Sequence, residues 1–156
     1  MSAVDLGDLV TPEGIMLDWP APNKRNVLVS LATRAAQLSE QHAAKVIDVI
    51  LEREALGSTG FGSGTAIPHG RLEGLGRTIV VAARLGTPVD FAALDGLPVD
   101  LVILMLAPSE GGADHLKSLA RVSRALRDSN FCRKLRGAAS SDAFYVLLAG
   151  EQRLAM

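Results

Sequence analysis

Apolar residues are most concentrated over residues 99–107, where Asp100 is the one polar position among nine. A run that is apolar on both faces is typical of a strand in the middle of a sheet. Residues 78–85, rich in Val, Ile and Ala, predict a second long strand. Shorter strands are expected at 15–17 and 65–67.

In five other stretches the apolar residues recur at the spacing of a helix. Residues 24–38 carry their apolar side chains on one helical face, and Asn23 just before them is the expected N-terminal cap. Because helices and strands are mixed along the chain, we predict an α/β fold with a central sheet covered by helices. We expect one domain over 15–150, an N-terminal segment over 1–14 and a C-terminal tail over 151–156. The other predicted helices lie at about 42–55, 113–126, 130–135 and from 141 onward.

The composition suits a globular protein with one core. The chain has 156 residues, 48% apolar and 21% charged, with a formal net charge of −1. Such a chain has no overall positive field to attract nucleic acid or a membrane surface. The longest apolar run, residues 101–108, is far shorter than the ~20 residues of a membrane-spanning helix. With one cysteine and no signal-peptide pattern, the sequence predicts a soluble cytoplasmic protein.

Residues 57–71, GSTGFGSGTAIPHGR, have the features of a reactive site, because four glycines precede a single histidine, His69. Pro68 fixes its own φ and favours an extended shape in the residue before it. Gly70 is expected to let the chain turn sharply after the imidazole. A histidine beside a loop rich in free backbone N–H groups is suited to an anion. We therefore expect His69 to take up and pass on a phosphoryl group.

The chemistry of phosphoryl transfer explains why these residue types belong together. An imidazole has an ordinary pKa of ~6.5, so a neutral, nucleophilic ring is available near pH 7. The incoming group spreads its charge over three oxygens, and catalysis depends on donors aimed at them. Backbone N–H groups at Gly62 and Gly64 and the hydroxyl groups of Thr59 and Ser63 are the expected phosphate-binding groups. Neither a metal nor a cofactor is required.

Other motifs fail at identifiable positions. No Gly-Lys-Ser/Thr follows the glycines, so the stretch is not a Walker loop, and it follows a predicted helix, whereas a dinucleotide fingerprint follows a strand. The three histidines, His42, His69 and His115, have no spacing typical of a zinc site. His42 is interpreted as a surface or capping residue. His115 follows the strongest strand, near the sheet edge where α/β proteins place their sites.

Basic residues gather late in the chain, and Lys117, Arg121 and Arg124 share one helical face. A solvated face and a docking surface for an acidic partner both remain open for them. Cys132, despite its basic neighbours, is interpreted as a structural residue.

Residues 59–70, TGFGSGTAIPHG, resemble the signature of the mannitol/fructose-type EIIA components of the bacterial phosphotransferase system. The resemblance covers nearly the whole chain, from about residue 15 to 150. The LERE segment at 51–54, the PVDL segment at 98–101 and His115 follow in the family's order.

The resemblance implies a mixed β-sheet sandwiched by α-helices and a role for three residues. It makes His69 the histidine that is phosphorylated by the phosphocarrier protein HPr or its nitrogen-branch relative NPr. It makes His115 the second active-site histidine and Arg53 an arginine at the phosphate site. Ser63 stands where many relatives carry Asn, a departure that bears on fine geometry and not on the reaction.

Among family members, the chain is most similar to the nitrogen-regulatory EIIA proteins, which implies a phosphorylation-state signal that binds other proteins. Two alternatives remain open. One is a sugar-specific, fructose/mannitol-type EIIA that hands the phosphoryl group to an EIIB domain. The other is a module of the same fold that binds partners without phosphate chemistry. A carrier requires His69, His115 and Arg53 to converge on one shallow depression, and a pure binding module does not.

Overall fold

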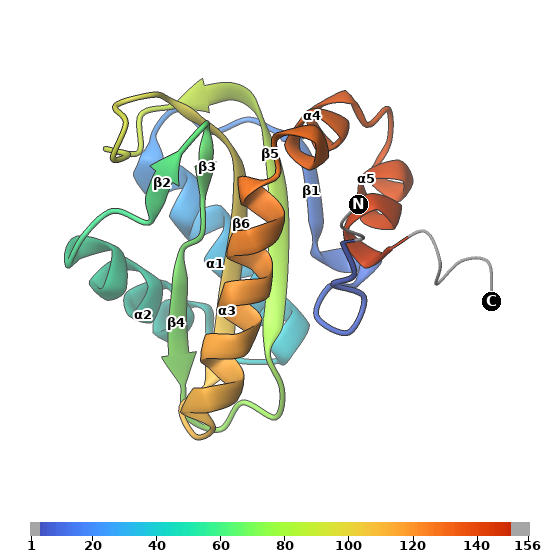
Figure 1. Cartoon of the computed structure of the whole chain (residues 1–156). Coiled ribbons are helices and arrows are strands. Elements are labelled where there is room, and N and C mark those ends of the chain that lie inside the picture. The colour runs from blue at the N-terminus through green and yellow to red at the C-terminus, as the bar shows by residue number, and fades with distance from the viewer. Residues whose placement is uncertain (1–3, 151–156) are drawn as a thin grey trace.

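The computed structural model describes residues 4–150. It holds a mixed six-stranded sheet with helices on both faces (Figure 1), which confirms the predicted fold class. In chain order the elements are the 3-10 helix η1 (Pro12–Gly14), β1 (Ile15–Trp19), α1 (Lys24–Ser39), α2 (Ala43–Ala55), β2 (Gly60–Gly62), β3 (Thr65–Ala66), β4 (His69–Leu72), β5 (Ile79–Val89), β6 (Val99–Pro108), α3 (Gly112–Arg127), α4 (Ser129–Gly137) and α5 (Ser141–Ala149).

Strand β6 is the centre of the sheet, as its apolar sequence predicts. It pairs with β5 in antiparallel fashion along one side. Along its other side it pairs in parallel first with β3 and then with β4. The full order is β1-β5-β6-β3-β2, with β4 beyond the end of β3. This register sets His69 beside Met105, next to the best-buried strand of the protein.

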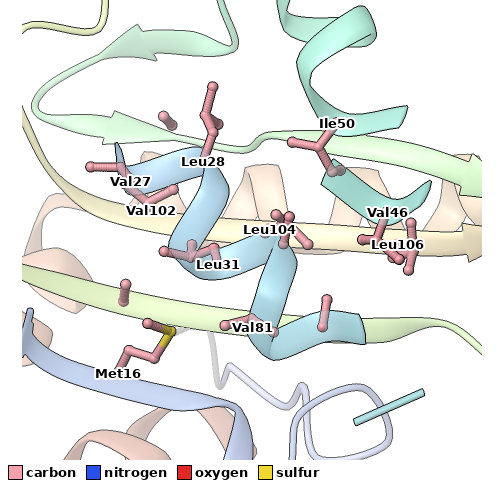
Figure 2. Close-up of a cluster of buried hydrophobic side chains, with 14 of the residues drawn as sticks. Met16, Val27, Leu28, Leu31, Val46, Ile50, Val81, Val102, Leu104 and Leu106 are labelled. Carbon is pink, nitrogen blue, oxygen red and sulfur yellow. The ribbon is translucent and has the colours of Figure 1, made fainter. Parts of the chain in front are cut away.

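The two faces of β6 belong to two different cores, because successive side chains of a strand point in opposite directions. Leu104 and Leu106 pack with α1 and α2 on one face (Figure 2). Ile103 and Met105 pack on the other face with α3, α4 and α5. Full burial of one such side chain is worth about 1.5–3 kcal/mol, so both layers of helices are held firmly against the sheet.

Side-chain caps fix where three helices begin. The Asn23 side chain accepts a hydrogen bond from the backbone N–H of Asn26, which confirms the predicted cap of α1. Asp128 caps α4 and Ser140 caps α5, each by accepting the N–H three residues later. The helix predicted at about 130–135 begins slightly earlier, at Ser129, because Asp128 supplies the cap. A cap must precede the first helical residue.

The structure describes most of the predicted N-terminal segment but not the predicted C-terminal tail. Residues 1–3 and the predicted tail over 151–156 lie outside the described residues. Leu6, Leu9 and Val10 are buried, so this part of the predicted N-terminal segment packs onto the core. The backbone N–H of Leu6 also donates to the carbonyl oxygen of Leu148. Within residues 4–150, each helix is too short or too polar to cross a membrane.

Candidate functional site

His69 opens strand β4, and the backbone continues straight past it. Sequence reasoning placed a sharp turn at Gly70, and this prediction is wrong, because Gly70 is paired with Leu106 within the strand. The glycine is needed for a close approach to α2 instead. A Cβ atom at Gly70 would lie 2.6 Å from Cγ1 of Val49, a distance at which one of the two must move. The missing side chain therefore lets α2 pack directly on β4.

The alternation along β4 directs His69 and Arg71 to the face of the sheet that α3 covers, since Gly70 and Leu72 face α2. A pocket of about 810 Å³ opens here between α2, β4 and α3. Arg53 from α2, His69 and Arg71 from β4, and His115 from α3 all line it. The predicted convergence of His69, His115 and Arg53 on one depression is therefore present in the structure.

The His69 ring is held in one tautomer. Its Nδ1 atom lies 2.8 Å from the carbonyl oxygen of Ile67. A carbonyl oxygen only accepts hydrogen bonds, so Nδ1 carries the proton and donates it, which leaves a lone pair on Nε2. Burial lowers the pKa of His69 from its ordinary value, and the charges of Arg53 and Arg71 lower it further, against the opposing effects of the Ile67 hydrogen bond and the Glu54 charge. Near pH 7 the ring is therefore neutral, as a nucleophile must be.

His115 is the second imidazole of the pocket, and it lies in the first turn of α3 with 5% of its surface exposed. The two ring centroids are 5.8 Å apart, with 43° between the ring planes. Burial lowers the pKa of His115 as well, helped by the charges of Arg71 and His69. Among residues 4–150 its buried Nδ1 atom has no hydrogen-bond partner. Such an atom is costly unless a ligand satisfies it.

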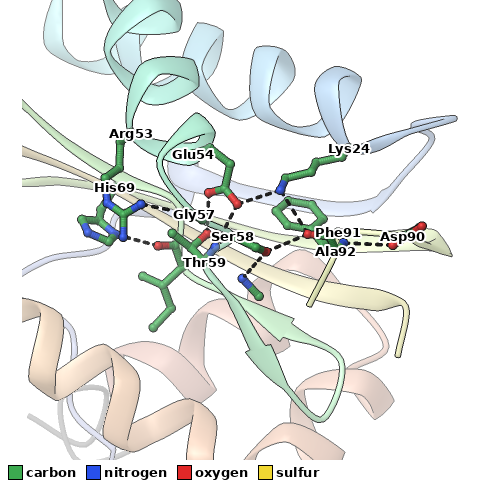
Figure 3. A network of polar contacts seen from close by, with 12 residues as sticks. Lys24, Arg53, Glu54, Gly57, Ser58, Thr59, His69, Asp90, Phe91 and Ala92 are labelled. Carbon is green, nitrogen blue, oxygen red and sulfur yellow. Dashed lines mark hydrogen bonds and ion pairs between the residues drawn. The ribbon is translucent and has the colours of Figure 1, made fainter. Parts of the chain in front are cut away.

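Arg53 lies in the last turn of α2, beside His69 (Figure 3). Its Nη1 atom donates to the carbonyl oxygen of Gly57 at 3.0 Å. This bond satisfies one carbonyl group just beyond the end of the helix and holds the guanidinium near the pocket. The expected phosphate-site arginine therefore has a defined position.

Glu54, the next residue, supports this end of α2 from inside the protein (Figure 3). It is 6% exposed and forms an ion pair with Lys24 at 2.9 Å. Its two carboxylate oxygens accept hydrogen bonds from the backbone N–H and the hydroxyl group of Thr59, at 2.8 and 2.7 Å. Thr59 was an expected phosphate-binding residue, but both of its donors are used by Glu54, and the described pocket lining does not include it.

The glycine-rich turn between β2 and β3 lies away from the pocket. Gly62, Ser63 and Gly64 all have positive φ, which explains two of the glycines by backbone shape. The N–H of Ser63 donates to Asp95, and its carbonyl oxygen accepts from Arg136. Within the described part of the chain, none of these three lines the pocket. Their expected role in phosphate binding thus has no support from the geometry.

Two features at or beside the pocket were not predicted from the sequence, Arg71 and the ion-pairing role of Glu54. Arg71 shares a face with His69, a relation that the strand period gives only once β4 is recognised. Glu54 belongs to the quoted LERE segment, but its buried pairing with Lys24 depends on contacts between distant residues.

The other candidates lie outside the pocket. His42 is exposed at the start of α2, and its side chain makes no capping hydrogen bond. The buried Cys132 thiol donates to the carbonyl oxygen of Leu126, and burial raises its pKa. Arg121 of the late basic face pairs with Asp8. Over residues 4–150, no group of three His, Cys, Asp or Glu side chains is placed to hold a metal ion.

The family model described as "Phosphoenolpyruvate-dependent sugar phosphotransferase system, EIIA 2" matches residues 8–150. The chain belongs to this EIIA family. The resemblance first noted at residues 59–70 is therefore confirmed, and the protein is a component of a phosphotransferase system.

Individual EIIA relatives add detail. A nitrogen regulatory protein of Bradyrhizobium diazoefficiens is 48% identical over 142 residues, which make up 91% of this chain and 93% of that protein. The crystal structure of the nitrogen regulatory protein IIA-Ntr from Neisseria meningitidis superposes with a TM-score of 0.87 at 29% identity, covering 92% of this chain and 98% of that one. IIA mannitol from Escherichia coli gives a TM-score of 0.76 at 25% identity, with coverage of 90% and 99%.

Proposed function

We propose that this EIIA protein is a phosphoryl carrier whose acceptor atom is Nε2 of His69, and that its phosphorylation state governs which proteins it binds. The observation that carries the proposal is the pocket itself. It joins a neutral imidazole with a free Nε2 lone pair, a second imidazole and the Arg53 guanidinium. A module that only binds partners has no need of this set, so the pocket favours the carrier.

The transfer step needs no cofactor. The Nε2 lone pair of His69 forms a new N–P bond while the N–P bond on the donor's phosphohistidine breaks. The donor imidazole keeps the bonding electron pair and leaves neutral. The proton of His69 stays on Nδ1, where the Ile67 carbonyl oxygen stabilises the positive charge that the ring gains. Arg53 faces the charge that spreads over the phosphoryl oxygens.

The rim of the pocket suits a donor that is a protein. Leu56 and Leu116, which are 85% and 61% exposed, both line it. Large apolar side chains left in water beside a reactive group are typical of a protein-binding surface. We infer that HPr or NPr docks here, and that the protein works in the cytoplasm, where it meets this donor.

A regulatory role is favoured by the names of the similar proteins, because the 48% identical relative is called a nitrogen regulatory protein. The sugar-specific role is the second candidate, and the similarity to IIA mannitol keeps it open. The two roles differ in the fate of the phosphorylated protein. A sugar-specific protein passes its phosphoryl group rapidly to an EIIB domain, whereas a regulator changes its binding to target proteins.

The test uses the purified chain with enzyme I, HPr or NPr and radiolabelled phosphoenolpyruvate. We expect an acid-labile label on the wild-type protein and none on His69→Ala. His42→Ala removes an exposed imidazole outside the pocket and should be labelled like the wild type. If His69→Ala still takes up label, another residue is the acceptor. Affinity capture with His69→Ala and the charged mimic His69→Asp then separates partners that respond to phosphorylation from those that do not.

A further inference from the structure

Arg71 lines the pocket that holds His69, and it comes from a different element than Arg53. It follows His69 by two residues in β4, so both side chains leave the strand on the face that α3 covers. Arg53 comes instead from the end of α2. Both guanidinium groups line the pocket that holds His69.

The position of the Arg71 guanidinium is fixed by its contact with the start of α3. A Cβ atom built on Gly112 would lie 3.3 Å from Nη1 and 3.5 Å from Nη2 of Arg71. The guanidinium therefore lies over the first turn of this helix, and the bare glycine leaves room for it. His115 stands in the same turn. Arg71 thus contacts the turn of α3 that also carries the second imidazole.

The charge of Arg71 is left uncompensated. Arg84, Arg121 and Arg136 each form an ion pair with a carboxylate. For Arg71, no such pair occurs within the part of the chain that the structure describes. Its charge acts on the pocket all the same, because it lowers the pKa of both His69 and His115.

The other charges that line the pocket leave an excess of positive charge. Glu52 is the one carboxylate in the described lining, against the guanidinium groups of Arg53 and Arg71. The buried Nδ1 of His115 also lacks a partner among residues 4–150. Two guanidinium groups against one carboxylate in the pocket lining point to an anionic ligand.

We propose that Arg71 is a second phosphate-binding guanidinium, which contacts the oxygens of the phosphoryl group on His69 from the α3 side while Arg53 contacts them from the α2 side. This inference rests on the proposed role of His69. Two guanidinium groups in one pocket can share the charge that spreads over the phosphoryl oxygens. Arg71 takes part in no bond making or breaking.

The test is independent of any partner protein. Wild type, Arg71→Ala and Arg71→Lys are phosphorylated chemically with potassium phosphoramidate, and the phosphohistidine is titrated by phosphorus NMR. A cation beside a phosphate favours its dianion, so loss of Arg71 should raise the second pKa of the phosphoryl group by about half a unit. Arg71→Lys keeps the charge without the fork of donors and should fall between the two.

Arg127→Ala is the matched control, because Arg127 is an exposed arginine at the far end of α3, roughly 20 Å from the first turn by the rise of a helix. Its phosphoryl pKa should equal that of the wild type. Labelling by HPr or NPr should also slow about tenfold in Arg71→Ala and not in Arg127→Ala.

Equal phosphoryl pKa values in Arg71→Ala and Arg127→Ala would overturn the role of Arg71. A failure of HPr and NPr to label the wild type is a different result, because it contradicts the proposed function and leaves the chemical titration to decide the role of Arg71.

Discussion

Two polar clusters lie on either side of the end of α2, and they differ in whether their members are satisfied. In the first, Glu54 pairs with Lys24 and accepts two hydrogen bonds from Thr59, so that each charged or polar group has a partner. In the second, Arg71 has no carboxylate partner and His115 has an unpartnered nitrogen among residues 4–150. The sequence places Arg53 and Glu54 side by side, yet one belongs to each cluster.

The two clusters differ in role, because one stabilises the fold and the other is open to a ligand. A buried cluster with matched partners adds rigidity and has nothing left to offer a ligand. A pocket lined by two guanidinium groups and one carboxylate favours an anionic ligand. We infer that the Glu54 cluster holds the end of α2 in place so that the pocket can remain ready for a phosphoryl group.

The largest effect on stability is expected from Glu54→Gln. The amide cannot balance the charge of Lys24, and breaking a buried pair in this way costs about 2–4 kcal/mol, with Lys24 partly relieved by water. Urea denaturation followed by Trp19 fluorescence measures the loss. Asp8→Asn breaks the more exposed pair with Arg121 and should cost under about 1 kcal/mol. Equal losses in the two variants would contradict the supporting role of the Glu54 cluster.

Gly70→Ala should come next, because the added Cβ atom meets Val49 at 2.6 Å. Overpacking of this kind costs about 1–3 kcal/mol and should also slow transfer by shifting His69. The same urea experiment and the labelling assay report both changes. Gly76→Ala is the control, since its Cβ would meet nothing within 4 Å, and it should change stability by less than about 0.5 kcal/mol. A Gly70→Ala protein as stable as this control would show that α2 does not need the close approach.

His115→Ala tests the second cluster, the one that contains Arg71 and His115. It removes a neutral imidazole from the pocket but leaves the acceptor in place, so the label should still appear on His69, about tenfold more slowly. Single-turnover labelling by HPr or NPr gives the rate. An unchanged rate would leave His115 as a packing residue only, and complete loss of label would show that transfer to His69 cannot proceed without it.

The smallest expected effect is a dependence of stability on pH. Burial lowers the pKa of both His69 and His115 in the folded protein below the ordinary value of 6.5. As the pH falls below that value, the unfolded chain therefore binds protons before the folded protein does, and stability decreases. Replacing both histidines by Ala should flatten this slope between pH 7 and pH 5. A slope that stays the same would assign the effect to other groups.

The sequence predicts the regular parts of this fold well, because they depend on long periodic patterns. Strand β6 and helix α1 have clear apolar periods and appear where expected. Strand β4 has four residues, and only Leu72 among them is apolar, so no period marks it. A glycine in such a segment can mean a turn or a close approach, and only the position of Val49 decides for Gly70.

The sequence predicted that His69, His115 and Arg53 lie together, but it did not predict their surroundings. The resemblance to the EIIA family identifies His69, His115 and Arg53 because they belong to recognisable motifs. The phosphate-binding role expected of the glycine-rich turn assumed free N–H groups, but Asp95, from a distant loop, accepts the hydrogen bond of Ser63. Long-range partners of this kind leave no local signal in the sequence.

We propose that the phosphoryl group is carried on Nε2 of His69, because Nδ1 is engaged by the Ile67 carbonyl oxygen. Nitrogen–proton correlation NMR of the imidazole rings in the phosphorylated protein tests it directly, because each ring nitrogen has its own signal. We expect phosphorus coupling at Nε2 of His69, with Nδ1 still protonated. Coupling at Nδ1, or on any other residue, would contradict it.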